Sequence, residues 1–452
     1  MKKQFMLYGY SSNTDGTYFL NNRIFTQNVD FRTEEHYRYY LESGFNVLML
    51  EGNDPYYGET WETSQTKKNM DAACKAGIKQ IIIYDKRIFD CSAVRGGIVG
   101  EGKRFKTNGE LEDFIRFCVK DYKKHPAFIG IMLVDEPRWF QIPSVAAVIR
   151  AVKKVDPEIY IQCNILPYYP GHGELFVENY DGVNESEAYR KYVENYLDQT
   201  CADHLMYDSY PMRLEPKDGY FIRREHLLGL QIAAEEVKKR NLTFNFVCQT
   251  QAFYAHDKIV YRAPNEAEMR WQVNCVLAFG IKSIAYFTYW RKQRNSELEY
   301  FVDGTSFMTQ DGRKTPLYFA MQKIHGELGE ISDYLLDCEY ETSSYYTDLK
   351  NTESHLEPMI KNDLSEYIEI SGDGKTSVVI TVLCHKPTGD KVICLFNAND
   401  PRGNYGGISE LSVKTNALKI KNTFSLRYPH GNELKDGKLS LASGDGIFII
   451  AK

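Results

Sequence analysis

Short apolar segments alternate with longer amphipathic ones over the first three quarters of the chain. Eight of the apolar segments are rich in Val, Ile, Phe and Tyr and show little polar alternation, which is typical of strands buried on both faces. They span residues 5–10, 45–50, 78–84, 128–134, 159–165, 204–208, 243–248 and 282–290. Strands of this kind belong to parallel sheets whose connections are helices.

Between these segments, apolar residues recur at helical spacing. The pattern predicts helices over residues 34–43, 110–123, 144–155, 223–240, 266–280 and 317–336. Eight strands, each followed by a helix, favour a closed (β/α)₈ TIM barrel of the α/β class. The first strand is not followed by G-x-G-x-x-G, which argues against an open dinucleotide-binding sheet.

The pattern changes after about residue 338. Short strands are predicted at residues 367–370, 377–384, 391–397, 410–414, 423–428 and 446–451, with Asp-Gly and Gly-Gly turns among their connections. Their number and spacing predict an antiparallel β-sandwich. We therefore expect a barrel catalytic domain over residues 1–337 and an accessory β-sandwich domain over residues 338–452, which supports the barrel.

Composition restricts the partners of the protein. A net charge of −6 argues against nucleic acid or an anionic membrane as the main partner. The chain has no run of 18 apolar residues that could span a membrane, and its first apolar stretch is too short for a signal peptide. The ten cysteines form no C-x-x-C pair, so we expect a cytoplasmic protein. No His, Asp or Glu residues have the spacing of metal ligands, and we expect no cofactor. Whether the chain forms a homo-oligomer stays open.

Polar or aromatic residues stand at nearly every predicted strand end. In a (β/α)₈ barrel these ends converge on one mouth, where the active site lies. We predict that three carboxylates there are catalytic: Asp135, Glu136 and Asp208. The other nine are predicted to bind substrate: Glu51, Asp85, Asn164, Tyr210, Gln249, Gln251, Tyr289, Trp290 and Arg291.

The most specific stretch is residues 125–137, HPAFIGIMLVDEP, in which an apolar fourth strand ends in two carboxylates and a proline. Burial and a neighbouring carboxylate both raise the pKa of a carboxyl group. Glycoside hydrolysis needs a protonated carboxyl group beside the leaving oxygen, and Glu136 suits that role.

This stretch resembles the fourth-strand Asn-Glu-Pro motif of clan A glycoside hydrolases, with Asp135 in place of the Asn. Residues 269–291, which end in Tyr-Trp-Arg, resemble the last helix and strand of family 42 β-galactosidases, and residues 207–211 (YDSYP) resemble a sixth-strand end of the same broad group. The resemblance implies an oligosaccharide or glycoside substrate, Glu136 as acid/base, and Trp290 and Arg291 beneath the bound sugar.

The seventh strand departs from the clan A pattern. It ends in Gln249 and Gln251, where a retaining enzyme has a nucleophilic Glu, and an amide cannot replace that group. Three explanations stay open. In the first, Asp135 and Glu136 form a substrate-assisted pair, since they resemble the adjacent Asp-Glu of family 20 and family 123 hexosaminidases. In the second, Asp208 or Glu51 acts as the base of an inverting reaction. In the third, the barrel binds sugar without cleaving it. The sequence thus predicts a glycoside hydrolase, and the alternative is a catalytically silent carbohydrate-binding barrel.

Overall fold

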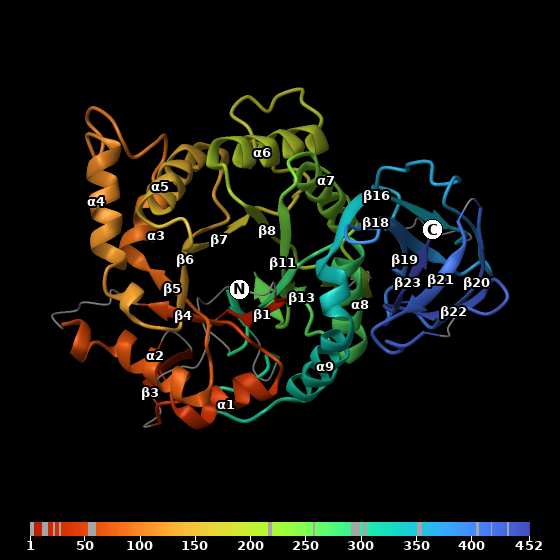
Figure 1. Ribbon diagram of the computed structural model, residues 1–452, viewed down its shortest axis with the longest axis horizontal. Helices are drawn as coiled ribbons and strands as arrows, with labels where there is room; N and C mark the ends of the chain where they lie inside the picture. Colours follow the sequence, from red (N-terminus) through yellow and green to blue (C-terminus); the bar gives the residue numbers. More distant parts are fainter. Residues whose placement is uncertain are drawn as a thin grey trace.

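Eight parallel strands form the first part of the chain and nearly close into a barrel (Figure 1). The computed structural model describes residues 4–10, 17–20, 23–26, 29–52, 60–215, 219–255, 258–290, 299–301, 305–349, 355–403, 406–416, 418–431 and 434–452. The barrel strands are β1 (Met6–Gly9), β4 (Leu48–Gly52), β5 (Ile81–Asp85), β6 (Phe128–Asp135), β7 (Tyr160–Ile165), β8 (His204–Asp208), β11 (Thr243–Gln249) and β14 (Ser283–Phe287). The predicted barrel is confirmed.

A side chain completes the barrel between its first two strands. The N–H of Val47 donates to the carbonyl of Leu7 at 3.2 Å. Beside it, the amide of Asn46 donates to the carbonyl of Phe5 at 2.8 Å and accepts the N–H of Leu7 at 2.9 Å. β1 and β4 have no regular ladder of backbone hydrogen bonds, and the side chain of Asn46 replaces part of it.

The barrel interior is filled by every second residue of the strands, because side chains alternate between the two faces. Its apolar layer comprises Tyr8, Tyr10, Val47, Met49, Ile82, Met132, Met206, Val247 and Ala285. Inward positions of β7 and β8 also carry polar side chains, at Gln162, Asn164 and Asp208, and all three are buried. The polar mouth therefore lies directly above an apolar barrel core.

Nine helices among the described residues surround the barrel: α1 (Glu34–Glu42), α2 (Gln65–Ala76), α3 (Lys86–Ser92), α4 (Asn108–Val119), α5 (Ile142–Val155), α6 (Glu185–Thr200), α7 (Glu225–Lys239), α8 (Glu266–Ala278) and α9 (Pro316–Leu336). Side-chain caps begin many of them; Asn184 caps α6, and Asn265 forms a capping box with Glu268 at α8. Four single turns, η1 (Trp61–Thr63), η2 (Tyr122–Lys124), η3 (Trp139–Gln141) and η4 (Gly173–Leu175), complete the helical part.

Short strands are added to the loops that follow the barrel strands. A five-stranded sheet joins β9 (Met212–Glu215), β10 (Gly219–Ile222), β12 (Phe253–Ala255), β13 (Lys258–Tyr261) and β15 (Glu299–Phe301), and β2 (Thr17–Leu20) pairs with β3 (Arg23–Thr26). Neither sheet was predicted from the sequence. Both are built from residues of the loops that follow barrel strands, which is the end of a (β/α)₈ barrel where the mouth lies.

Two antiparallel sheets follow α9, as the sequence predicts. One contains β16 (Cys338–Thr347), β18 (Ser377–His385), β19 (Asp390–Asn397), β23 (Gly446–Ala451) and β21 (Ile420–Phe424), and the other contains β17 (Ile368–Ser371), β20 (Ile408–Thr415) and β22 (Lys438–Ala442). An apolar core of Val, Ile and Leu residues lies between them. Of these eight strands, β16 and β22 were not predicted.

The sandwich packs beside α7 and α8 of the barrel (Figure 1). The indole of Trp271 on α8 donates to the carbonyl of Ala398 at 3.0 Å and packs edge-on against Phe396, with 5.1 Å between the ring centroids. One apolar core cluster contains residues of both parts. A division into two domains at residue 337 therefore stays a prediction. No helix of the described residues is both long and apolar enough to cross a membrane.

Candidate active site

A β-bulge at the end of β6 sets the direction of Asp135. Met132 pairs with Gln162 of β7, but the next pair is Asp135 with Asn164, so β6 has one residue more than β7 between the two pairs. Leu133 and Val134 both belong to the core cluster between barrel and helices. The extra residue lets two apolar side chains pack outward in succession and returns Asp135 to the mouth, which is how bulges re-aim side chains.

Glu136 has a left-handed backbone, with φ of 48°. Its N–H donates to the carbonyl of Asn164 at 3.0 Å, so this conformation is held by β7. A left-handed conformation costs a residue with a Cβ about 1–2 kcal/mol, and the following Pro137 restricts the backbone of Glu136 further. Strained residues of this kind cluster at functional sites.

Asn164 is the centre of a buried hydrogen-bond network beneath the two carboxylates. Its amide nitrogen donates to Asp135 at 2.7 Å, and its amide oxygen accepts from the Tyr10 hydroxyl at 2.8 Å and from Gln162 at 2.7 Å. Gln162 in turn accepts from the Tyr8 hydroxyl at 2.5 Å. The network fixes the amide orientation of Asn164, and the exposed carboxylate of Asp135 is held from below.

Asp208 lies at the end of β8 and is only 3% exposed. Its Oδ2 accepts a hydrogen bond of 3.4 Å from the Tyr210 hydroxyl, and its Oδ1 has no hydrogen-bond partner among the described residues. Burial, then the neighbouring Glu136 and Asp135, raise the pKa of Asp208 well above its usual value. Burial and Asp135 raise the pKa of Glu136 to about 8. Both carboxyl groups therefore bind a proton more tightly than free carboxyl groups do.

Two further groups lie close to these carboxylates and were not predicted from the sequence. Arg223, 7% exposed, stacks on the Tyr169 ring at 4.3 Å and donates to the carbonyl of Tyr168. Its positive charge lowers the pKa of Glu136 and so opposes the effect of burial. The pKa of Tyr169 is raised by burial and by Glu136. A Tyr-Tyr pair between two prolines, at residues 167–170 after β7, is the signal that could have indicated this wall of the site.

Asp85 has structural partners away from the mouth. It is fully buried, caps α3 through the N–H of Arg87 at 2.9 Å, forms an ion pair with the Arg87 side chain at 2.5 Å, and accepts from the Tyr122 hydroxyl at 2.9 Å. The carboxylate of Asp85 is therefore engaged by groups of the protein itself and needs no ligand. A role of Asp85 in substrate binding therefore stays a prediction.

The predicted residues of the last two barrel strands are also buried. Gln249 donates to the carbonyl of Arg262 at 2.8 Å and accepts the N–H of Met212 at 3.2 Å. It therefore connects the loop that follows β8 with the loop that follows β11. Gln251 accepts from Thr288 at 3.2 Å, and its Nε2 has no partner within the described part of the chain.

Tyr289 and Trp290 are at most 1% exposed and pack among other aromatic rings. They form part of the wall behind the mouth. Arg291 and the side chain of Glu51 lie outside the described residues.

A cavity of about 680 Å³ lies elsewhere, between η1, α2 and the segment before β6; Trp61, Lys67, Asp71 and His125 are among its lining residues. None of its lining residues belongs to the strand ends. Within the described residues, no group of three or more His, Cys, Asp or Glu is placed to hold a metal ion.

A scan against protein-family models and a search of curated proteins find no match. Solved structures similar to this chain include a protein described as a glycoside hydrolase (11% identity, 97% of this chain and 96% of that chain, TM-score 0.49) and a glycoside hydrolase family 5 protein from Bacteroides vulgatus (11%, 98% and 95%, 0.49). A β-glucuronidase from Parabacteroides merdae is 10% identical with a TM-score of 0.36; the match covers 98% of this chain but only 61% of the β-glucuronidase. At these values the similarity says nothing about individual site residues.

Proposed function

We propose that the protein is a glycoside hydrolase in which Glu136 is the general acid. The observation that carries the proposal is the environment of this carboxyl group, which raises its pKa to about 8 at a strained position beside two further carboxyl groups. At neutral pH Glu136 is then mostly protonated and can donate to the oxygen of the departing sugar or alcohol. Such donation contributes about 10²–10⁴-fold to the rate.

The second carboxylate of the proposed mechanism is Asp135. Asp208 is buried, and burial together with the neighbouring Glu136 and Asp135 raises its pKa well above the usual value, so the charged form that would activate water is disfavoured. Asp135 is exposed and held by Asn164. This arrangement suits the substrate-assisted reaction that the resemblance to family 20 and family 123 hexosaminidases implies. There the acetamido oxygen of the substrate attacks the anomeric carbon, Asp135 orients the acetamido N–H, and Glu136 protonates the leaving oxygen.

Strand β11 supports a mechanism without an enzyme nucleophile at that strand. It ends in Gln249, whose amide is already bonded to the backbone of Met212 and Arg262. A neutral amide with these partners is not available to form a glycosyl-enzyme bond. The proposed substrates are therefore 2-acetamido-2-deoxyhexosides, whose own acetamido group supplies the nucleophile.

The test is a screen of aryl glycosides, including aryl N-acetylhexosaminides, against the wild type and Glu136→Gln. We expect turnover of at least one N-acetylhexosaminide and a loss of about 10²–10⁴-fold in Glu136→Gln for substrates with poor leaving groups. The exposed Glu187 pairs with Lys191 on α6, so Glu187→Gln is the matched control and should keep full activity. Sugar binding without any turnover by the wild type would instead support a carbohydrate-binding barrel.

A further inference from the structure

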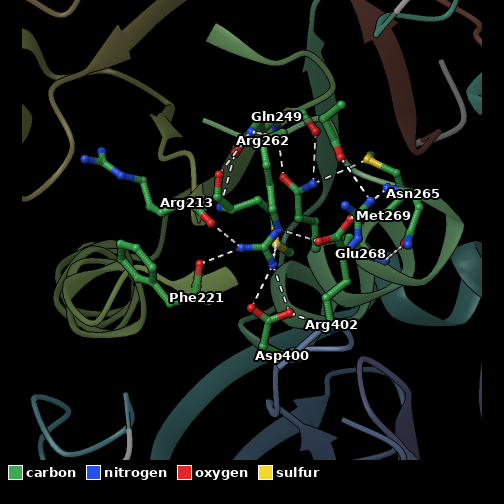
Figure 2. A network of polar contacts seen from close by, with 12 residues as sticks. Arg213, Phe221, Gln249, Arg262, Asn265, Glu268, Met269, Asp400 and Arg402 are labelled. Carbon is green, nitrogen blue, oxygen red and sulfur yellow. Dashed lines mark hydrogen bonds and ion pairs between the residues drawn. The ribbon is translucent and has the colours of Figure 1, made fainter. Parts of the chain in front are cut away.

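We infer that Asp400, on the loop after β19 in the C-terminal sandwich, is a positioning residue for the mouth of the barrel, acting through Arg262. Asp400 accepts from Nη2 of Arg262 with both carboxylate oxygens, at 2.8 and 2.7 Å (Figure 2). Arg262 follows β13 directly and is 2% exposed. The contact therefore ties the sandwich to the hairpins above the barrel, and not only to the outer helices.

All N–H groups of the Arg262 guanidinium are directed at named partners. Its Nε donates to Glu268 at 2.5 Å, and its Nη1 donates to the carbonyls of Arg213, on β9, and Phe221, on β10, the latter at 2.8 Å. Figure 2 shows these partners arranged around the guanidinium. One planar group thus connects β9, β10, α8 and the sandwich, which a lysine could not do with its single ammonium.

The surrounding charges are balanced. Arg402 donates to the second oxygen of Glu268 at 2.8 Å, and its backbone N–H donates to Asp400 at 2.9 Å. Two arginines therefore face two carboxylates, and Glu268 is fully buried. A buried charge that loses its partner is strongly unfavourable, whereas the complete set is stable. The loop at residues 400–402 is thus part of the network.

The network reaches the candidate active site through Met212 and Tyr261. The N–H of Arg262 donates to the carbonyl of Met212 at 3.1 Å, four residues after Asp208. Tyr261, next to Arg262, packs edge-on against Tyr210 with 5.5 Å between the ring centroids. Tyr210 is the hydroxyl donor to Asp208. When Arg262 is held in place, the aromatic side of the mouth is held over the carboxylates.

Asp400→Asn tests this inference, with Asp445→Asn as the control. Asp445 also accepts from an arginine, Arg427, at 2.8 and 3.0 Å, but this pair lies within the sandwich. Hydrogen exchange is followed by mass spectrometry in β9, β10 and β13. In Asp400→Asn we expect exchange about tenfold faster there than in the wild type, with β18 and β19 unchanged as evidence of an intact sandwich. Asp445→Asn should leave β9, β10 and β13 as in the wild type.

Asp400→Glu keeps the carboxylate and should restore most of the protection. Unchanged exchange in the three strands of Asp400→Asn would overturn the inference, and so would an equal increase in Asp445→Asn. This readout needs no catalysis.

The effect on catalysis rests on the proposed function. If the protein hydrolyses glycosides, Asp400→Asn should lower kcat about 10- to 100-fold with a smaller change in KM, because the reacting groups are displaced while sugar contacts persist. An inactive wild type with the expected exchange pattern would count against the proposed function alone. An active Asp400→Asn variant with wild-type kcat would count against the positioning role alone.

Discussion

Asn164 holds Asp135 by a hydrogen bond of 2.7 Å from its amide nitrogen, and the Asn164 carbonyl accepts the N–H of the next residue, Glu136, at 3.0 Å. One residue of β7 therefore holds both the carboxylate of Asp135 and the backbone of Glu136. The Tyr10 and Gln162 side chains complete the set of partners and leave the Asn164 amide one orientation.

Asp135→Asn distinguishes the proposed mechanism from an inverting one. If Asp135 orients the substrate acetamido group, the variant should lose about 10²-fold or more of kcat/KM on substrates with both good and poor leaving groups. Paired aryl N-acetylhexosaminides that differ in leaving-group pKa measure this. A loss confined to poor leaving groups would contradict the assigned role and place Asp135 in the proton-donating step.

The pH profile should have an alkaline limb set by Glu136. The acid is active when protonated, and its pKa is raised to about 8, so kcat/KM should fall as the pH rises through that value. The charge of Arg223 lowers this pKa, so Arg223→Gln should move the limb to higher pH. Initial rates between pH 5 and 10 check both. A limb that stays in place in Arg223→Gln would show that another group titrates.

Stability should depend on pH through the same carboxyl group, whether or not the protein is an enzyme. The folded protein raises the pKa of Glu136 from 4.5 to about 8, so it binds the proton more tightly than the unfolded chain does. That stabilisation is complete below about pH 4.5 and is lost as the pH rises through 8. Glu136→Gln cannot ionise, so at pH 9 it should be more stable than the wild type by on the order of 5 kcal/mol.

Thermal melts of both proteins from pH 5 to pH 9 measure the difference, which should be smallest at pH 5. A difference independent of pH would show that Glu136 titrates normally.

The sequence predicted the barrel well because its strands carry uninterrupted apolar runs. It was less informative about which strand-end residues face inward. Alternation along β5 places Ile82 inside the barrel, so Tyr84 faces the mouth and Asp85 faces the helices. Because inward positions recur at every second residue, the apolar layer could have been used to predict that Asp85 points away from the barrel interior. Asp208 lies two residues after Met206 and therefore shares its inward face. The bulge in β6 interrupts this alternation, and no residue of that strand indicates a bulge.

Asp85→Ala should destabilise the fold by about 3–5 kcal/mol. The change removes the cap of α3 and leaves Arg87 and the Tyr122 hydroxyl without their buried partner. Urea unfolding measures the free energy, and Asp113→Ala, at an exposed pair with Arg116 on α4, should change it little. A normal free energy of unfolding with a raised KM would instead assign Asp85 to substrate binding, as the sequence analysis predicted.

Gly130 allows β6 and β7 to approach closely. A Cβ at this position would lie 2.2 Å from the carbonyl oxygen of Tyr160, which is backbone and cannot turn away. Gly130→Ala should therefore destabilise the protein by about 1–3 kcal/mol or more and disturb the pairing of Asp135 with Asn164. Gly329→Ala is the control. Gly329 is exposed in α9, and a Cβ there would have no neighbouring atom within 4 Å, so alanine should raise the free energy of unfolding by about 1 kcal/mol. Equal free energies of unfolding for the two variants would contradict this reasoning.

The loops explain why the rest of the site was not predicted. Arg223 lies at the base of the β9–β10 hairpin, where its backbone N–H donates to the carbonyl of Pro211 at 2.9 Å and adds one pair beyond Met212 and Ile222; the sequence did not indicate this hairpin. Gln249 was predicted to bind substrate from its place at a strand end, but the backbone groups that engage it come from two hairpins the sequence did not indicate. Strand interiors follow periodicity, whereas loop contacts depend on the assembled mouth.

The left-handed backbone at Glu136 affects which residue would be selected there if the protein were evolved or redesigned for thermal stability. Glycine is the residue that adopts such a φ without a steric penalty, and it has no carboxyl group to desolvate. A library sorted only for heat resistance should therefore enrich glycine at position 136. The most thermostable clones would be those in which the proposed acid has disappeared.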